Sequence, residues 1–386
     1  MFRMKKLYFL LFLIGLQLTV AAQDSAFSRQ WVDTLTSSYF FGRGYTRQGM
    51  QKAAGYISNA FMQYGLIPLA GDSYQQEFSF DVNTFPGDMD VTINNKKLVP
   101  GIDFIVFPES VGSHAKGKLQ QADSVTFINR DDKIMVTLSD KLTWSVAKEV
   151  APYTGIELNK KAITGEPASF KITIENKFVK DFTAANIAAM VKGTEQPDSF
   201  IFITAHYDHL GSMGGTTYFP GANDNASGIA LLMNLAHYYA SHPQRYSMGF
   251  ICFAAEEAGL VGSKYFTEHP LVPLSQIRFL INTDLAGTGS EGITVVNATE
   301  FPKEFALMNE VNDKDHLLVK INPRGKAANS DHYYFTEKGV PSFFFYTQGG
   351  IGAYHDVFDI AATLPLNEQE DLFKLVTGFC NKLMHN

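Results

Sequence analysis

Histidines and acidic residues recur in this sequence directly after apolar runs of strand length. The run IFITA leads into His206 and Asp208, and three later runs lead into an acidic pair, an aspartate and a histidine. Because open α/β sheets bind ligands at the carboxyl ends of their strands, we expect these side chains to share one sheet edge. Imidazole nitrogens and carboxylate oxygens together suit zinc and similar divalent metals. The three later positions are Glu256 with Glu257, Asp284, and His355.

The segment GANDNASG adds Asp224, which lies at the predicted start of a helix. We expect the free backbone N–H groups of that helix to hold the carboxylate, which suits a group that bridges two metals. A two-metal hydrolase also needs terminal ligands on each side and a free base beside the bridging water. Successive side chains at a strand end point in different directions, so one of Glu256 and Glu257 can bind metal while the other is the base. Asp208 is expected to hydrogen-bond the His206 imidazole and fix its tautomer.

Taken singly, each of these residues has an ordinary structural explanation. A histidine in HYDH can be a surface or core residue, and EE can be the acidic first turn of a helix. The aspartate of NTD can cap a helix or turn, and HD after the last strand can be a polar loop. These explanations do not account for the recurrence of the groups at the ends of successive strands. We therefore interpret them as one site.

The elements that must position this site follow the order of an α/β protein. After two strands joined by a short turn, FKITIENKF and AANIAAMVKG, the order is strand, helix, strand, helix, strand, loop, strand, helix. This order predicts a mixed, largely parallel sheet sandwiched by helices, with the last helix over 367–383. Upstream, 25–66 is predicted to be helical, with an apolar stripe in GMQKAAGYISNAFMQYGL and Gly65 as its C-cap. We interpret the stripe as a core face, and a helix that docks a partner is the alternative.

Between these parts, alternating apolar and polar residues with turn signals predict a β-rich insertion over 85–169. It contains no cluster of histidines and acids, so we expect it to shape access or substrate choice. The predicted organisation is a signal peptide (1–22), an N-terminal helical part of the catalytic domain (23–84), the insertion (85–169) and the main catalytic part (170–386).

Composition and net charge argue against some classes of binding partner. The formal charge of −7 without a dense Lys/Arg run argues against nucleic acid and anionic membrane surfaces. Residues 1–22 run from basic to apolar to small, the order of a secretory signal peptide cleaved after Ala22, with a membrane anchor as the alternative. We therefore expect a secreted or periplasmic protein, free of the membrane after cleavage. Cys252 and Cys380 are the two cysteines, too few for a cysteine-rich zinc site, and a disulfide between them stays open.

Six ordered blocks resemble the co-catalytic zinc exopeptidases of metallopeptidase family 28, the aminopeptidase-Y type. They are AHYDHLG, PGANDNASGIALL, FAAEEAGLVGSKYF, NTDLAG, SDHYYF with GVPSFFF, and AYHDVFD. The resemblance implies the zinc exopeptidase, phosphorylase/hydrolase-like fold and two zinc ions per chain. The insertion loosely resembles the protease-associated domain of many members. GRG before the N-terminal helix and residues 66–71 after it also resemble the family.

The resemblance also implies roles for single residues. Asp224 would bridge the metals, with Glu257 and His355 completing one site and His206 and Asp284 the other. Glu256 would be the general base, and Tyr354 matches a tyrosine that in some members hydrogen-bonds the oxyanion. Ser330, Asp331 and His332 match a family block to which the resemblance gives no role, whereas His209, Asp356 and Asp359 are interpreted as supporting residues.

The function that follows is a secreted two-zinc aminopeptidase acting on peptides with a free N-terminus. One alternative is a single-zinc glutaminyl cyclase, but such proteins place tryptophan before the final histidine, and Trp31 and Trp144 are far from the motifs. A carboxypeptidase or dipeptidase is a second alternative, with Arg324 and Lys326 as cations for a substrate carboxylate. A metal-free binding module is a third, disfavoured because all five ligands and the base are present.

Overall fold

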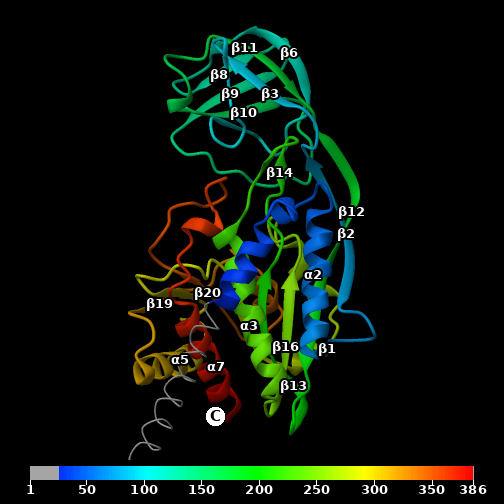
Figure 1. Cartoon of the computed structure of the whole chain (residues 1–386), viewed down its shortest axis with the longest axis vertical. Coiled ribbons are helices and arrows are strands. Elements are labelled where there is room, and N and C mark those ends of the chain that lie inside the picture. Colours follow the sequence, from blue (N-terminus) through cyan, green and yellow to red (C-terminus); the bar gives the residue numbers. More distant parts are fainter. Residues whose placement is uncertain (1–25, 386) are drawn as a thin grey trace, which may run out of the picture.

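A nine-stranded mixed sheet forms the body of the protein in a computed structural model that describes residues 26–385 (Figure 1). The expected signal peptide lies outside the described residues. The sheet order is β1-β12-β16-β13-β17-β20-β18-β19, with β2 paired to β12. The strands are β1 (Ile67–Pro68), β2 (Gln75–Thr84), β12 (Lys177–Val191), β13 (Gln196–His206), β16 (Tyr246–Phe253), β17 (Ile277–Thr283), β18 (Ile293–Val296), β19 (Ile321–Pro323) and β20 (Ser342–Thr347).

The four central strands, β16, β13, β17 and β20, are parallel, and β12 and β18 join them as antiparallel neighbours. Parallel strands are covered on both faces and therefore read as continuous apolar runs. In β13, Ile201 and Ile203 pack into the core on one face, whereas Phe200 and Phe202 pack into a second core on the other. The predicted mixed, largely parallel sheet is confirmed.

Helices cover both faces. The helices α2, α3, α5 and α7 contribute to the larger core, and Figure 1 shows α2, α3 and α7 in front of the sheet, while α4 and α6 pack on the opposite core. Over the described residues, no helix has the length and apolar character needed to cross a bilayer. The helices are α2 (Gly49–Tyr64), α3 (Gly228–Ser241), α4 (Val261–Glu268), α5 (Pro302–Asp315), α6 (His332–Glu337) and α7 (Gln369–His385).

The N-terminal helical part differs from its prediction because it is two helices, 26–35 and α2, separated by a folded turn with η1 (Phe41–Arg43). Gly42 and Gly44 make this turn fit, since a Cβ on either would lie 2.4 Å or less from backbone atoms of Gly211. The stripe on α2, with Ile57 and Phe61, is buried in the core, so the partner-docking alternative is wrong.

The residues between β2 and β12 form two further sheets around a core of their own, at the top of Figure 1. One has the order β5-β10-β9-β8-β7 and the other β4-β3-β11-β6. The strands are β3 (Met89–Ile93), β4 (Lys96–Lys97), β5 (Phe104–Val106), β6 (Ser113–Lys118), β7 (Gln120–Gln121), β8 (Thr126–Asn129), β9 (Ile134–Ser139), β10 (Thr154–Asn159) and β11 (Ser169–Ile174).

The insertion ends later than predicted. FKITI forms β11, which pairs with β3 and β6 of the insertion, and the chain then continues as the single 15-residue strand β12. The predicted turn between two strands is instead a bulge in β12 between Val179 and Phe182, where Asp181 has a φ of 51°. The long strands β2 and β12 therefore carry the chain between the two parts of the molecule (Figure 1).

The predicted loop after β17 also contains structure. Residues 293–337 form β18, α5, β19 and α6. The strand β18 has only four residues, and α5 buries only Met308, Val311 and Asn312, so neither gives a strong periodic signal. A short two-stranded ribbon of β14 (Ser212–Met213) and β15 (Thr217–Tyr218) follows β13.

Candidate metal centre

The predicted site residues meet at one edge of the sheet. His206 is the last residue of β13, Asp284 follows β17, and the two glutamates lie just beyond the end of β16. Since these strands are parallel, their carboxyl ends share an edge. The segment before α3 adds Asp224, and the loop after β20 adds His355. They line a cavity of about 250 Å³ with His206, Asp224, Glu256, Glu257, Asp284, Leu285, Asn329, Phe344, Tyr346, Tyr354 and His355 on its walls.

Asp224 lies between two histidines. Its Oδ1 is 3.4 Å from His206 Nε2, and its Oδ2 is 3.1 Å from His355 Nε2. On one side, Asp284 Oδ2 is 3.3 Å from His206 Nε2, and on the other, Glu257 Oε2 is 3.2 Å from His355 Nε2. The side chains therefore form two groups of three that share Asp224, as the assignment of one bridging and four terminal ligands requires.

Glu256 and His209 are close neighbours of these groups. Potential ligand atoms of His206, Glu256 and Asp284 lie within 4.8 Å of one another, as do those of His209, Asp224 and Glu257. His209 Nδ1 is 2.7 Å from Glu257 Oε1, so His209 contacts a candidate ligand directly. Its position three residues after His206 is a weak signal in the sequence, which predicts only a supporting role for it.

Asp208 supports the site differently from the prediction. His206 Nδ1 faces the backbone carbonyl of Asp208 at 3.2 Å, whereas the Asp208 carboxylate is farther away, at 3.8 Å. That carboxylate instead accepts hydrogen bonds from the backbone N–H groups of Glu256, at 3.1 Å, and Glu257, at 3.3 Å. The carbonyl therefore orients the imidazole, and the carboxylate positions the loop that carries both glutamates.

The loop that carries Asp224 is held by Asp359, and not by the start of a helix as predicted. Asp224 lies within η3 (Ala222–Ser227), and α3 begins only at Gly228. The N–H groups of Asn223 and Asp224 donate to the carboxylate of Asp359, at 2.8 and 3.0 Å, and not to Asp224's own side chain. The Asp224 carboxylate is thus directed toward the two histidines while Asp359 fixes its backbone.

Arg43 supports the site although no pattern in the sequence predicts a role for it. Its fully buried guanidinium donates to the backbone carbonyls of Tyr207, Pro220, Gly221 and Asp224, at 2.7–3.2 Å, and also to Leu35. It therefore ties the end of β13 to the Asp224 loop. The GRG motif, matched only as a family block, was the available signal.

Ser330 belongs to a chain of hydrogen bonds that ends at Asp284. Thr204 Oγ1 donates to Asn282 Oδ1, Asn282 Nδ2 donates to Ser330 Oγ, and Ser330 Oγ donates to Asp284 Oδ2, at 2.8, 2.8 and 3.5 Å. This chain of hydrogen bonds orients the Asp284 carboxylate. Asp331, the next residue, is buried, and burial raises the pKa of its carboxyl to about 7.

The two adjacent glutamates have opposite electrostatic environments. Burial raises the pKa of Glu256 well above its ordinary value, and Asp331 adds to this rise while His206 opposes it. Burial acts in the same direction on Glu257, but His355 and His209 outweigh it and hold the pKa of Glu257 well below the ordinary value. Titratable neighbours whose pKa values are pushed apart are typical of separate acid–base and ligand roles.

The charges of the site fit divalent cations. Buried carboxylates surround the cavity, whereas Arg43 is the one buried cationic side chain of lysine or arginine type within 26–385. Asp284 Oδ1 and His209 Nε2 are buried without a hydrogen-bond partner. Buried charge is costly unless it is paired or binds metal, so this donor set matches the oxygen and nitrogen ligands of zinc. The buried acids are Asp208, Asp224, Asp284, Asp331, Asp356 and Asp359, with Glu257 4% exposed at its side chain.

Tyr354 lies at the mouth of the cavity, 42% exposed. Its ring stacks on His355 with centroids 4.0 Å apart and 14° between the ring planes. Burial and then Asp224 raise the pKa of its hydroxyl, so the phenol stays protonated and able to donate. The oxyanion role stays a prediction.

The mixed sheet and the histidine–carboxylate cluster at its edge define an α/β protein with a candidate metal centre. The chain belongs to peptidase family M28, since the model of that family matches residues 186–379. Aminopeptidase YwaD of Bacillus subtilis is 26% identical over 281 residues, which cover 71% of this chain and 55% of that protein. The chain thus spans about half the length of this curated relative.

Two solved structures share the fold. An aminopeptidase from Aneurinibacillus sp. strain AM-1 has a TM-score of 0.67 and 19% identity, with 93% of each chain covered. A peptidase M28 precursor from Shewanella amazonensis has a TM-score of 0.72 and 15% identity, with 97% of this chain and 96% of that chain covered. At these identities the likeness concerns the fold.

Proposed function

We propose that this protein is a zinc-dependent aminopeptidase that holds two zinc ions and removes N-terminal residues from peptides. The observation that carries the proposal is the position of Asp224, whose two carboxylate oxygens face His206 and His355 on opposite sides. Membership of a peptidase family and the name of the related aminopeptidase support the same activity.

His206 and Asp284 would hold one ion, Glu257 and His355 the other, and Asp224 both. When bound, the two ions would polarise the scissile carbonyl and acidify the attacking water. Glu256 lies beside the His206 group, and burial raises the pKa of its carboxyl well above its ordinary value, which makes it a stronger proton acceptor than an ordinary glutamate. Its carboxylate takes a proton from the water as the oxygen bonds to the carbonyl carbon, and delivers it to the amine nitrogen as the C–N bond breaks.

Selectivity for a free N-terminus follows from the charge and size of the cavity. A substrate ammonium is attracted to the surplus of carboxylates, of which Asp284 and Glu256 lie on the cavity wall. Leu285, Phe344 and Tyr346 provide an apolar wall for the side chain of the terminal residue. We expect this cavity, of about 250 Å³, to take up the terminal residue of the substrate.

A dipeptidase or carboxypeptidase activity is the second candidate, favoured by one contact. Arg324 Nη1 donates to the hydroxyl of Tyr346, which lines the cavity, at 3.0 Å, so a cation lies near the mouth. Lys326 forms an ion pair with Glu337 instead. A single-zinc glutaminyl cyclase would use Asp224, Glu257 and His355 only, and leave His206 with Asp284 without metal.

The basic, apolar and small segments of residues 1–22 support a secreted or periplasmic location after signal cleavage. Peptides are the proposed partners, and the charge of −7 gives no support for nucleic acid binding.

The test combines zinc stoichiometry with hydrolysis of aminoacyl anilides by the parent protein and Glu256→Gln. We expect two zinc ions in both proteins, and turnover only in the parent and only of substrates with a free amine. One zinc per chain with cyclisation of N-terminal glutamine would establish the cyclase. Equal turnover of N-blocked peptides with a free carboxylate would establish the carboxypeptidase.

A further inference from the structure

The insertion reaches the candidate metal centre through one pair of residues. The N–H of Trp144 donates to the carbonyl of His355 at 2.9 Å, and His355 Nδ1 lies 2.9 Å from the carbonyl oxygen of Trp144. Since a carbonyl only accepts, His355 donates the second bond through an Nδ1–H. Trp144 is far from the motifs in the sequence, but in the structure it lies directly against a candidate ligand.

These two bonds determine how His355 presents its other ring nitrogen. With the proton on Nδ1, Nε2 carries the lone pair, and Nε2 is the atom that faces Asp224 and Glu257 at 3.1 and 3.2 Å. The backbone of His355 has a φ of 53°, a left-handed conformation that is uncommon outside glycine and needs support from its surroundings. The Trp144 N–H supplies part of that support.

The Trp144 side chain fixes the backbone that makes these bonds. Its indole Nε1–H donates to the carbonyl of Val106 in β5 at 2.8 Å, within the insertion. Its ring stacks on Phe219 of the main domain, with centroids 4.7 Å apart and 25° between planes. One side chain therefore joins the core of the insertion to the loops beside the site.

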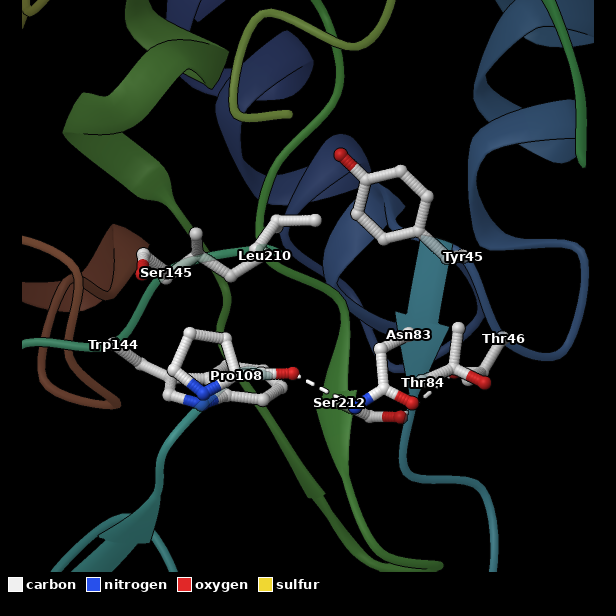
Figure 2. Close-up of a pocket in the computed structure, with 10 residues that line it drawn as sticks. Tyr45, Thr46, Asn83, Thr84, Pro108, Trp144, Ser145, Leu210 and Ser212 are labelled. Atoms are coloured by element: carbon white, nitrogen blue, oxygen red, sulfur yellow. Dashed lines mark hydrogen bonds between the residues drawn. The ribbon is translucent and has the colours of Figure 1, made fainter. Parts of the chain in front are cut away.

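The surrounding junction is closely packed. The residues beside Trp144 line a space of only about 10 Å³, room for roughly one water molecule. Figure 2 shows Trp144 and Pro108 on one side of this space and Asn83, Thr84 and Thr46 on the other. Nearby, Lys141 Nζ donates to the carbonyl of Gly352 at 3.0 Å, a second tie between the insertion and the loop of His355.

We propose that Trp144 is a positioning residue through which the insertion sets the tautomer of His355 and the zinc affinity of the Glu257/His355 half of the centre. This inference rests on the proposed function in taking His355 as a ligand. Under this proposal the insertion contributes to metal binding, in addition to shaping access to the site. Outer partners of metal-bound histidines contribute about 10- to 100-fold to metal affinity.

The experiment is a zinc titration of the metal-free full chain by calorimetry, for the parent, Trp144→Ala and Trp144→Phe. The matched control is Trp31→Ala, which removes the other tryptophan, 4% exposed against 5% for Trp144, where its ring packs on Tyr56 of α2 with centroids 4.8 Å apart. We expect Trp144→Ala to weaken one of two sites by about 10- to 100-fold. The same loss in the His206→Ala background assigns it to the His355 half.

A second readout observes the imidazole itself. In zinc-loaded protein labelled with ¹⁵N-histidine, the His355 signals, assigned by their loss in His355→Gln, are expected to show a proton on Nδ1. Trp144→Phe keeps ring stacking but loses the bond to Val106, and serves where Trp144→Ala does not fold.

The outcomes separate the two ideas. Fewer than two zinc ions in the parent overturns the proposed two-zinc centre, while a selective loss in the Trp144 variants still supports the inference. Two ions in the parent, with equal affinities in Trp144→Ala or Trp144→Phe, or with losses matched by Trp31→Ala, overturns the inference alone. A His355 ring protonated on Nε2 also overturns it.

Discussion

The Glu257 carboxylate lies between two imidazoles: its Oε1 is 2.7 Å from His209 Nδ1, and its Oε2 is 3.2 Å from His355 Nε2. His209 thus occupies one oxygen of a candidate ligand and leaves the other directed at the shared centre. His209 is fully buried, so it cannot exchange this contact for water.

Removal of His209 should loosen Glu257. We expect His209→Ala to reduce zinc affinity at one site by about 10- to 100-fold, because the carboxylate loses the contact that orients it. Zinc titration measures the change. His242→Ala is the control, since His242 is exposed and its ring stacks on Tyr238 at the end of α3. Unchanged zinc affinity in His209→Ala would contradict this role.

The two adjacent glutamates offer a matched pair of amide substitutions. We expect Glu256→Gln to lower kcat by about 10²- to 10⁴-fold with full zinc content, because it removes a proton acceptor and keeps the shape. Glu257→Gln should lose zinc from one site, because an amide replaces an ionised ligand. Parallel metal analysis and kinetics distinguish them. Zinc loss in Glu256→Gln and retention in Glu257→Gln would reverse the assignment.

Arg43 should be sensitive even to lysine. Lysine cannot reproduce the planar fork that reaches carbonyls on both sides of the Asp224 loop, and several buried acceptors would lose their donors. With each unsatisfied buried group costing about 1–3 kcal/mol, Arg43→Lys should lower the free energy of unfolding by at least about 3 kcal/mol. Urea unfolding measures this. Arg47→Lys, at an exposed arginine over the Phe41 ring, should change it little, and equal effects would refute the argument.

The thiols should be inert in the folded protein. Cys252 and Cys380 are both free and fully buried, and burial raises the pKa of Cys380 to about 12 and that of Cys252 still further from its usual range. We expect no alkylation by iodoacetamide without denaturant and two modified thiols with it. Mass spectrometry counts both. A disulfide, which the sequence left open, would leave both thiols unmodified in denaturant.

The sequence was a good guide to the candidate ligands because each follows an apolar run, and such runs are local signals. His206 and Asp284 could be placed at strand ends without knowing which strands pair. The partners were harder to predict. Arg43 and Trp144 act on or through backbone carbonyls, which carry no residue identity, so no pattern of side chains marks the contact.

The same distinction between local signals and long-range contacts applies to the fold. The central strands are apolar throughout and were predicted, whereas β11 has the same alternation whichever sheet it joins, and only its pairing with β3 and β6 assigns it to the insertion. The helical residues 26–35 and α2 were merged because the turn between them is held by contacts to Gly211, which lies far along the chain.

His332 should make stability depend on pH. Its ring is buried, with Phe344 5.2 Å away between centroids, and burial lowers the pKa of His332 to about 3. Below about pH 6.5 this histidine binds a proton in the unfolded chain but not in the folded chain. The free energy of unfolding therefore has its full value above that pH and falls as pH decreases toward 3. One proton corresponds to about 1.4 kcal/mol per pH unit, so about 2 kcal/mol is lost by pH 5.

The comparison of parent and His332→Gln isolates this residue from the other buried groups. Asp208, for example, has a carboxyl pKa raised by burial to about 7, which acts in the opposite direction as pH falls. We expect urea unfolding with chelator present to show that the parent loses about 2 kcal/mol more than His332→Gln between pH 8 and pH 5. His269→Gln, at an exposed histidine, should keep the parent's dependence. Identical pH dependence in parent and His332→Gln would mean that the His332 ring gains its proton in the folded state as readily as in the unfolded chain.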